Sequence, residues 1–238
     1  MSEQGVLPAP GAAAAVAAAV GDIVDIVDGV FARLHRVRDA AVRAVGPAPV
    51  SADLAALRPV LFPLLGGLIS GIGFIAAPGL LADAPWYLEW WQEGASGEPV
   101  QLIRDMNPSS SAFYDYTHWE WFAGPRSGAE HTMAGPYVDF LCTDEYSLTL
   151  SVPVLSGGEF LGVAAADVFV RRFETAVSPV LRGIEGPAFL VNASGRVVAS
   201  TTAKWLAGSI FRGAPGLAAR PCRKLPLSLV AAQLPHVP

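Results

Sequence analysis

Residues 113–167 hold most of the side chains in this chain that could do chemistry. The stretch begins with FYDYTHWEWF, continues through GPYVD and TLSVPV, and ends with GVAAADV. It combines aromatic rings with carboxylates, and ring faces beside negative charge attract cations. Apolar walls with a few polar groups are also the usual lining of small-molecule sites. The stretch therefore predicts a small pocket for a cationic or amphipathic ligand.

The same stretch also offers acid–base groups. A small hydrolase or lyase could use Asp115, His118 and Glu120 in one cleft, and His131 also titrates near neutral pH. Turnover needs proton donors and acceptors placed around a reacting atom, and neither histidine has a nucleophile or metal-ligand partner at a readable spacing. We expect a non-enzymatic binding domain without metal or cofactor. The enzyme and a dimerisation module that fills its own pocket stay as alternatives.

Composition narrows the class of protein. The chain has 238 residues, of which 52% are hydrophobic and 16% are charged, so it can bury a sizeable core. A net charge of -5 and the absence of a dense Lys/Arg block argue against nucleic acid as a partner. The two cysteines, Cys142 and Cys222, lie far apart in unrelated contexts. They favour a reduced, cytoplasmic setting over a disulfide.

Two segments raise the question of a membrane. The opening MSEQG lacks the positive charge of a secretory signal, and Asp22 soon follows the Ala/Val run. The stretch between Arg58 and Asp83 carries no charge, but it contains Pro63, Pro78 and five glycines. These residues favour the end of a helix followed by a buried strand, so we do not expect a membrane span.

Periodicity predicts the remaining elements. Residues 1–20 are Ala/Pro-rich and expected to be flexible. Apolar residues every three or four positions predict a long amphipathic helix over 22–45, acidic at its start and basic at its end. Ser51 is expected to cap a second helix over 51–65, shortened by Pro59 and Pro63. On the long helix, an apolar strip that includes Val20, Val24 and Phe31 is expected to contact the same helix of a second copy in a homodimer.

Branched and aromatic runs predict the strands. Three hairpins are expected: residues 68–77 pair with the WYLEWWQ run at 86–92, residues 145–155 pair with 159–170, and a third hairpin lies within 187–201. A further strand is expected at 100–106, and a helix at 171–184. Strand residues alternate faces, so only one of two neighbours among the tryptophans at 90 and 91 can reach a pocket. We expect an α+β domain over 21–208, with the long helix packed across an antiparallel sheet, and a Pro/Gly-rich tail over 209–238.

Four blocks of the central stretch resemble the pocket signature of Cache domains. In that signature an Asp is followed four residues later by an Arg and then, after one more residue, by Trp-Tyr or Trp-Phe. Asp115, Trp121 and Phe122 match this spacing. GPYVD, TLSVPV and GVAAADV follow in order at compatible distances, which makes the match specific although it covers only about half of the chain. The resemblance implies a PAS-like antiparallel sheet and a ligand-sensing role.

The resemblance also implies a set of ligand-binding side chains. Asp167 would bind an ammonium group, unless it is only the N-cap of the helix that follows. The other positions are Tyr114, Trp119, Trp121, Phe122, Tyr137 and Asp139. Trp119 stands where the amino-acid-sensing members carry the Arg that binds a carboxylate, and an uncharged indole cannot replace a guanidinium.

The missing Arg shapes the expected function. We expect an amine or quaternary ammonium ligand, with an amino acid as the alternative. If no α-carboxylate were bound at Trp119, an amino acid would need another donor, such as Arg104 or Arg126. The sequence shows no output segment, so the domain is expected to signal through a partner protein or through a second copy of itself.

Overall fold

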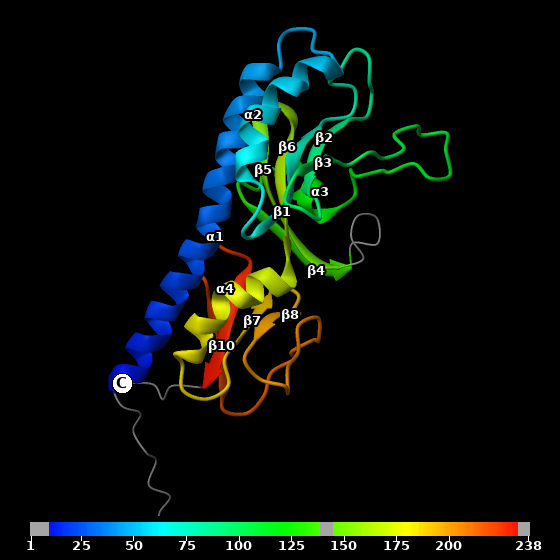
Figure 1. Cartoon of the computed structure of the whole chain (residues 1–238). Coiled ribbons are helices and arrows are strands. Elements are labelled where there is room, and N and C mark those ends of the chain that lie inside the picture. The colour runs from blue at the N-terminus through cyan, green and yellow to red at the C-terminus, as the bar shows by residue number, and fades with distance from the viewer. Residues whose placement is uncertain (1–9, 139–144, 233–238) are drawn as a thin grey trace, which may run out of the picture. The chain divides into compact units, whose positions relative to one another are not determined.

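The computed structural model describes residues 10–138 and 145–232 (Figure 1). They form two compact units. The central unit comprises Asp28–Arg172, and the terminal unit combines Met1–Val27 with Phe173–Pro238. Two helices contribute to both units, α1 (Pro10–Ala44) and α4 (Val170–Arg182).

The central unit is built on an antiparallel sheet with the strand order β3-β2-β1-β6-β5-β4. Its strands are β1 (Ile69–Ala76), β2 (Leu88–Glu93), β3 (Pro99–Gln101), β4 (Thr132–Val138), β5 (Tyr146–Ser156) and β6 (Glu159–Phe169). The expected hairpins are present, because β1 pairs with β2 and β5 with β6. The strand expected at 100–106 is shorter than predicted and pairs with β2 only along 99–101. The prediction of an α+β fold with a central antiparallel sheet is confirmed.

The middle of this sheet defines the face on which the candidate site lies. Gly71 of β1 pairs with Asp167 of β6, which pairs in turn with Thr149 of β5. Alternate residues of a strand share a face, so Gly73 and Ala165 lie on the same side as these three. We call this side the site face. The helix α3 (Glu120–Arg126) and the buried rings of residues 116–122 pack on it.

Short helices cover the opposite face. The helix expected over 51–65 is present as three pieces, η1 (Ser51–Leu57), α2 (Arg58–Leu61) and η2 (Phe62–Leu64). Pro59 and Pro63 each occupy an early position of a new piece, where a missing N–H is tolerated. The N-cap is Val50 and not Ser51, whose hydroxyl instead donates to Asp83 at 2.7 Å.

Helix α1 is longer than the sequence predicted. It begins at Pro10, because the alanines that suggested a flexible segment are the strongest helix formers. The expected apolar stripe is buried, as Leu34 and Val37 show with no exposed surface. The proposed dimer strip is wrong in part, since Val24 and Phe31 are also buried within the single chain. Homodimerisation itself stays a prediction.

The terminal unit contains a second sheet that the sequence reading missed. Its strand order is β8-β7-β10-β9, formed by β7 (Phe189–Asn192), β8 (Val197–Ser200), β9 (Leu217–Pro221) and β10 (Leu227–Ala232). The hairpin β7–β8 was expected, whereas β9 and β10 lie in the segment interpreted as a tail. Cys222 is a buried thiol between these two strands, and burial raises its pKa. Cys142 lies outside the described residues.

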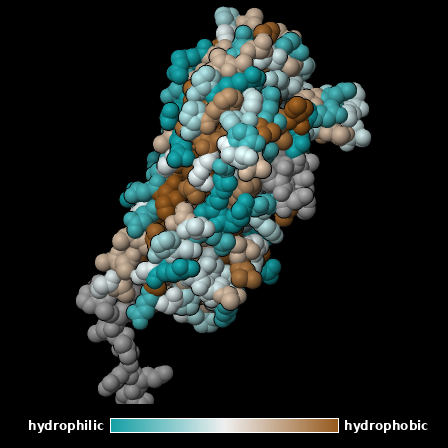
Figure 2. All heavy atoms as spheres, viewed as in Figure 1, coloured by the Kyte–Doolittle hydropathy of each residue, from teal (hydrophilic) through white to brown (hydrophobic). Residues whose placement is uncertain are grey.

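The long uncharged stretch before Asp83 forms η2 and β1. Across residues 10–138 and 145–232, no helix is long and apolar enough to span a membrane. On the face of the molecule shown in Figure 2, apolar residues reach the surface in small separate groups between polar ones. Among the large apolar side chains of residues 10–138 and 145–232, Ile103 in the loop after β3 is the most exposed, at 81%.

Candidate functional site

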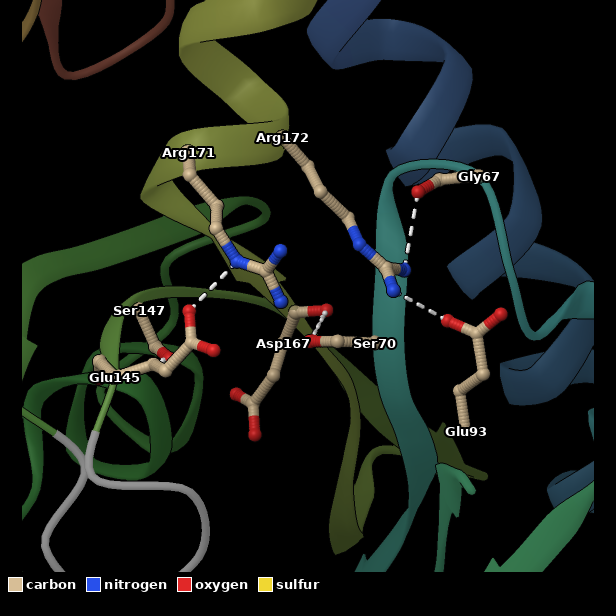
Figure 3. Close-up of polar contacts among 8 residues, drawn as sticks. All are labelled: Gly67, Ser70, Glu93, Glu145, Ser147, Asp167, Arg171 and Arg172. Carbon is tan, nitrogen blue, oxygen red and sulfur yellow. Dashed lines mark hydrogen bonds and ion pairs between the residues drawn. The ribbon is translucent and has the colours of Figure 1, made fainter. Parts of the chain in front are cut away.

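Asp167, which the sequence places at the end of a strand, lies near the end of β6, one of the two middle strands of the sheet. It is a residue of β6, three positions before α4 begins at Val170, so it is not the N-cap of that helix. Its side chain is half-buried on the site face. The Ser70 hydroxyl donates to its backbone carbonyl at 3.0 Å (Figure 3). Strand pairing on both sides therefore holds the carboxylate in a fixed place.

A chain of hydroxyl groups orients this carboxylate. Thr149 Oγ1 donates to Asp167 Oδ1 at 2.6 Å, and Tyr137 shares a hydrogen bond with the same threonine hydroxyl. A hydroxyl has one proton to give, so Thr149 must accept from Tyr137 while it donates to Asp167. An ionised carboxylate has about four acceptor sites, so it can accept hydrogen bonds from a ligand's N–H groups as well as from groups of the protein.

Two arginines follow Asp167 in the first turn of α4, and each contacts another acid. Arg171 Nε donates to Glu145 at 2.7 Å. Arg172 lies 2.6 Å from Glu93 and donates to the Gly67 carbonyl at 3.1 Å. In the view of Figure 3 the Asp167 carboxylate points away from both guanidinium groups. The carboxylate is thus directed along the sheet face and not towards the helix.

The predicted aromatic residues separate into two groups. Trp119, Tyr114 and Tyr137 are half-buried at the edge of the core, with the rings of Trp119 and Tyr137 5.9 Å apart. Trp121 and Phe122 are core residues, with 6% and 0% of their surface exposed. Neighbouring rings enclose Phe122, and its assignment as a ligand contact, like that of Trp121, stays a prediction. Asp139 lies outside the described residues.

The structure adds two aromatic residues that the sequence reading did not place in the site. Tyr116 is fully buried, its hydroxyl donates to the Ala76 carbonyl at 2.8 Å, and burial raises its pKa to about 12. Trp90 lies on the site face in the same apolar cluster as Ala165. Strand alternation predicted that one of two adjacent tryptophans would face a pocket, but not which one.

Trp91 faces the other way because a buried acid holds it. Glu89 has no exposed surface and accepts hydrogen bonds from Trp91 Nε1 at 2.8 Å, Arg58 Nε at 2.8 Å and the Tyr87 hydroxyl at 3.2 Å. Burial beside this carboxylate raises the pKa of Tyr87 to about 12. This polar cluster fixes the rotation of β2 and so directs Trp90 towards the site face.

The residues considered for catalysis are arranged differently. The Asp115 carboxylate accepts from the backbone and the hydroxyl of Thr117, and these bonds lower its pKa. His118 and Glu120 are exposed. His131 stacks on Phe31 and lies 3.1 Å from His35, measured between the two Nε2 atoms. In the described part of the chain, no three His, Cys, Asp or Glu side chains gather as metal ligands would.

A cavity of about 530 Å³ lies at the other end of the site face, lined by Ala77, Pro78, Trp86, Thr117, Arg126 and Phe160. Phe160 and Asp167 are seven residues apart on β6, which corresponds to roughly 23 Å of extended strand. Arg126 therefore lines this cavity and not the surroundings of Asp167. We place the candidate site at Asp167 because its carboxylate is oriented, whereas Arg126 is exposed.

No protein-family model matches the sequence. Three solved ligand-binding domains are similar in structure. PctC of Pseudomonas aeruginosa, in complex with GABA, has 19% identity and a TM-score of 0.56 over 90% of this chain and 95% of that chain. PctB of the same organism, in complex with L-Arg, has 15% identity and a TM-score of 0.60 over 90% and 91%. Tlp3 of Campylobacter jejuni, in complex with L-valine, has 11% identity and a TM-score of 0.65 over 94% and 91%. The chain therefore has the Cache-type fold of chemoreceptor ligand-binding domains, as its sequence blocks predicted.

Proposed function

We propose that the central unit is a non-enzymatic sensor or binding domain for a small molecule that carries an ammonium group. The observation that supports this most is the Asp167 carboxylate, half-buried on the site face and oriented by Thr149. A charge-assisted hydrogen bond from an ammonium group to such a carboxylate contributes about 1.5–3 kcal/mol. Trp119 and Tyr137 pack at the edge of the apolar cluster on the site face, and their ring faces would attract a cation.

The class of ammonium compound is a separate question. Trp119 in place of the expected Arg favours a simple amine or quaternary ammonium compound. The similar structures favour the alternative, because they were solved with GABA, L-Arg and L-valine, each of which has a carboxylate as well as an ammonium group. We therefore give the amino acid precedence over the amine as the ligand of this domain.

Catalysis is not part of this proposal. The acid–base residues considered for an enzyme are either exposed or engaged with neighbours, as Asp115 is with Thr117. The domain would pass ligand binding to a partner protein or to a second copy of itself, and a cytoplasmic setting stays a prediction.

A thermal-shift screen tests the proposal. It compares L-valine with isobutylamine, which lacks the carboxylate, and with isovalerate, which lacks the ammonium group; L-arginine with agmatine, and GABA with n-propylamine, extend the set. A ligand at a hundred times its Kd stabilises the fold by about 2.7 kcal/mol, which raises Tm by about 5–10 °C for a chain of this size. At least one ammonium compound should do so and isovalerate should not. A screen in which only compounds without an ammonium group raise Tm would contradict the proposal.

A further inference from the structure

The indole N–H of Trp90 is a buried donor without an acceptor. Trp90 is 6% exposed, and its Nε1 atom has no hydrogen-bond partner among the described residues. Buried N–H groups in folded proteins are almost always paired, and leaving one unpaired costs free energy. The orphaned donor therefore requires an explanation, and an acceptor on a bound molecule is one.

Two glycines of β1 explain why the indole can lie where it does. A Cβ atom on Gly71 would come within 3.1 Å of Trp90 Nε1, and one on Gly73 within 3.0 Å of the ring and 2.2 Å of the Glu89 carbonyl. Any side chain at these positions would displace the tryptophan. The absence of side chains at these two glycines lets the ring of Trp90 lie against β1, with Nε1 beside Gly71.

This position brings the donor close to Asp167. Gly71 and Asp167 are direct partners in the β1–β6 ladder and share the site face. Cβ positions of such partners are about 4.5–5.5 Å apart, which places Trp90 Nε1 within about 9 Å of the Asp167 Cβ atom. A ligand with an ammonium group and an oxygen three bonds away could hydrogen-bond to both side chains at the usual 2.7–3.2 Å.

We propose that Trp90 is a specificity-determining residue of this site, whose indole N–H donates to an oxygen of the ligand while Asp167 accepts from its ammonium group. This inference rests on the proposed function and adds a second requirement to it, namely a primary amine with a nearby acceptor oxygen. An indole N–H carries no charge, so it recognises a hydroxyl oxygen as well as a carboxylate oxygen. In this arrangement the Trp90 indole on β2 selects amines that carry an oxygen, and the residue at position 119 does not.

The test compares L-valine, L-valinol and isobutylamine by calorimetry on the wild-type chain and on Trp90→Phe. L-arginine and agmatine are measured in the same way. In the wild type, the oxygen-bearing members of a set should bind about tenfold or more tighter than the bare amine. In Trp90→Phe that advantage should disappear while the bare amine binds as before. Trp91→Phe is the matched control, since its N–H is bonded to Glu89 on the opposite face and its loss should leave the preference unchanged.

A second readout uses the wild-type protein and does not depend on how a variant folds. The chain has six tryptophans, so six indole N–H resonances are expected, and the one missing from Trp90→Phe identifies Trp90. Binding of valine or valinol should shift this resonance downfield, and isobutylamine should not. An unshifted Trp90 resonance, or an oxygen preference that survives in Trp90→Phe, would overturn the inference while leaving the ammonium site at Asp167 intact. If no ammonium compound of any set binds, the proposed function fails and the inference fails with it.

Discussion

Thr149→Val tests whether the hydroxyl chain prepares Asp167 for its ligand. Valine keeps the branched shape but removes the donor that lies 2.6 Å from Asp167 Oδ1. Thr149 is 2% exposed, so water cannot easily replace its hydroxyl. A hydrogen bond to a charged group contributes about 1.5–3 kcal/mol, and the half-buried Asp167 can recover part of this from solvent. We expect the lower figure, about 1.5 kcal/mol, which is roughly a tenfold loss of affinity for the ammonium ligand.

Calorimetric titration and urea denaturation together measure this effect. Thr149→Ser restores a hydroxyl and should keep most of the affinity. Ser151→Ala is the matched control on the same strand and face, because its hydroxyl donates to the Trp121 carbonyl at 2.6 Å and should affect stability without affecting affinity. The reasoning is refuted if Thr149→Val binds as tightly as the wild type, or if Ser151→Ala weakens binding just as much.

Three further predictions concern the frame around the site. Arg58→Met leaves the fully buried Glu89 carboxylate without its cation. Because Arg58 is 38% exposed, we expect the unfolding free energy from urea denaturation to fall by only about 2–3 kcal/mol. The double variant with Glu89→Leu should recover most of this loss. Burial, followed by the charges of Arg38 and His131, lowers the pKa of His35 below its usual 6.5. The contribution of neutral His35 to stability should therefore be fully present above about pH 6.5 and be lost as the pH falls. In His35→Gln, the unfolding free energy should depend less on pH between about pH 5 and 7. Tyr116→Phe removes the buried bond to the Ala76 carbonyl and should lower the unfolding free energy by about 1 kcal/mol with no change in m-value.

Local patterns predicted much of the central unit, although they missed the strand β4. The Ser-Gly-Gly turn at 156–158 placed the β5–β6 hairpin correctly, and the order of aromatic and carboxylate blocks placed Asp167 on its central strand. The resemblance to Cache domains supplied what periodicity could not, namely a reason to select one of many carboxylates as the expected ligand contact. The assignment of Phe122, which has no exposed surface, stays a prediction, because neighbouring residues in sequence can face a pocket or a core and only packing decides between them.

Other parts of the fold could not be predicted from local sequence patterns. The strands β9 and β10 are short and lie among prolines and glycines, and the pairing of β10 with β7 depends on contacts distant in sequence. The choice between Trp90 and Trp91 depends on Glu89, whose burial with Arg58 fixes the rotation of the strand. A buried ion pair between residues 31 positions apart leaves no periodic signal. The orphaned N–H of Trp90 is likewise visible only once the glycines of β1 are seen beneath the ring.

The most direct measurement is a calorimetric titration of the wild type and of Asp167→Asn with the ammonium compound that raises Tm most in the screen. Asparagine keeps the shape of the side chain and removes its charge. Binding should weaken by about ten- to a hundred-fold, as expected for the loss of about 1.5–3 kcal/mol, while Tm of the unliganded protein changes little. Unchanged affinity in Asp167→Asn, or collapse of the unliganded fold, would show that Asp167 is a structural residue and would contradict the assignment of the site.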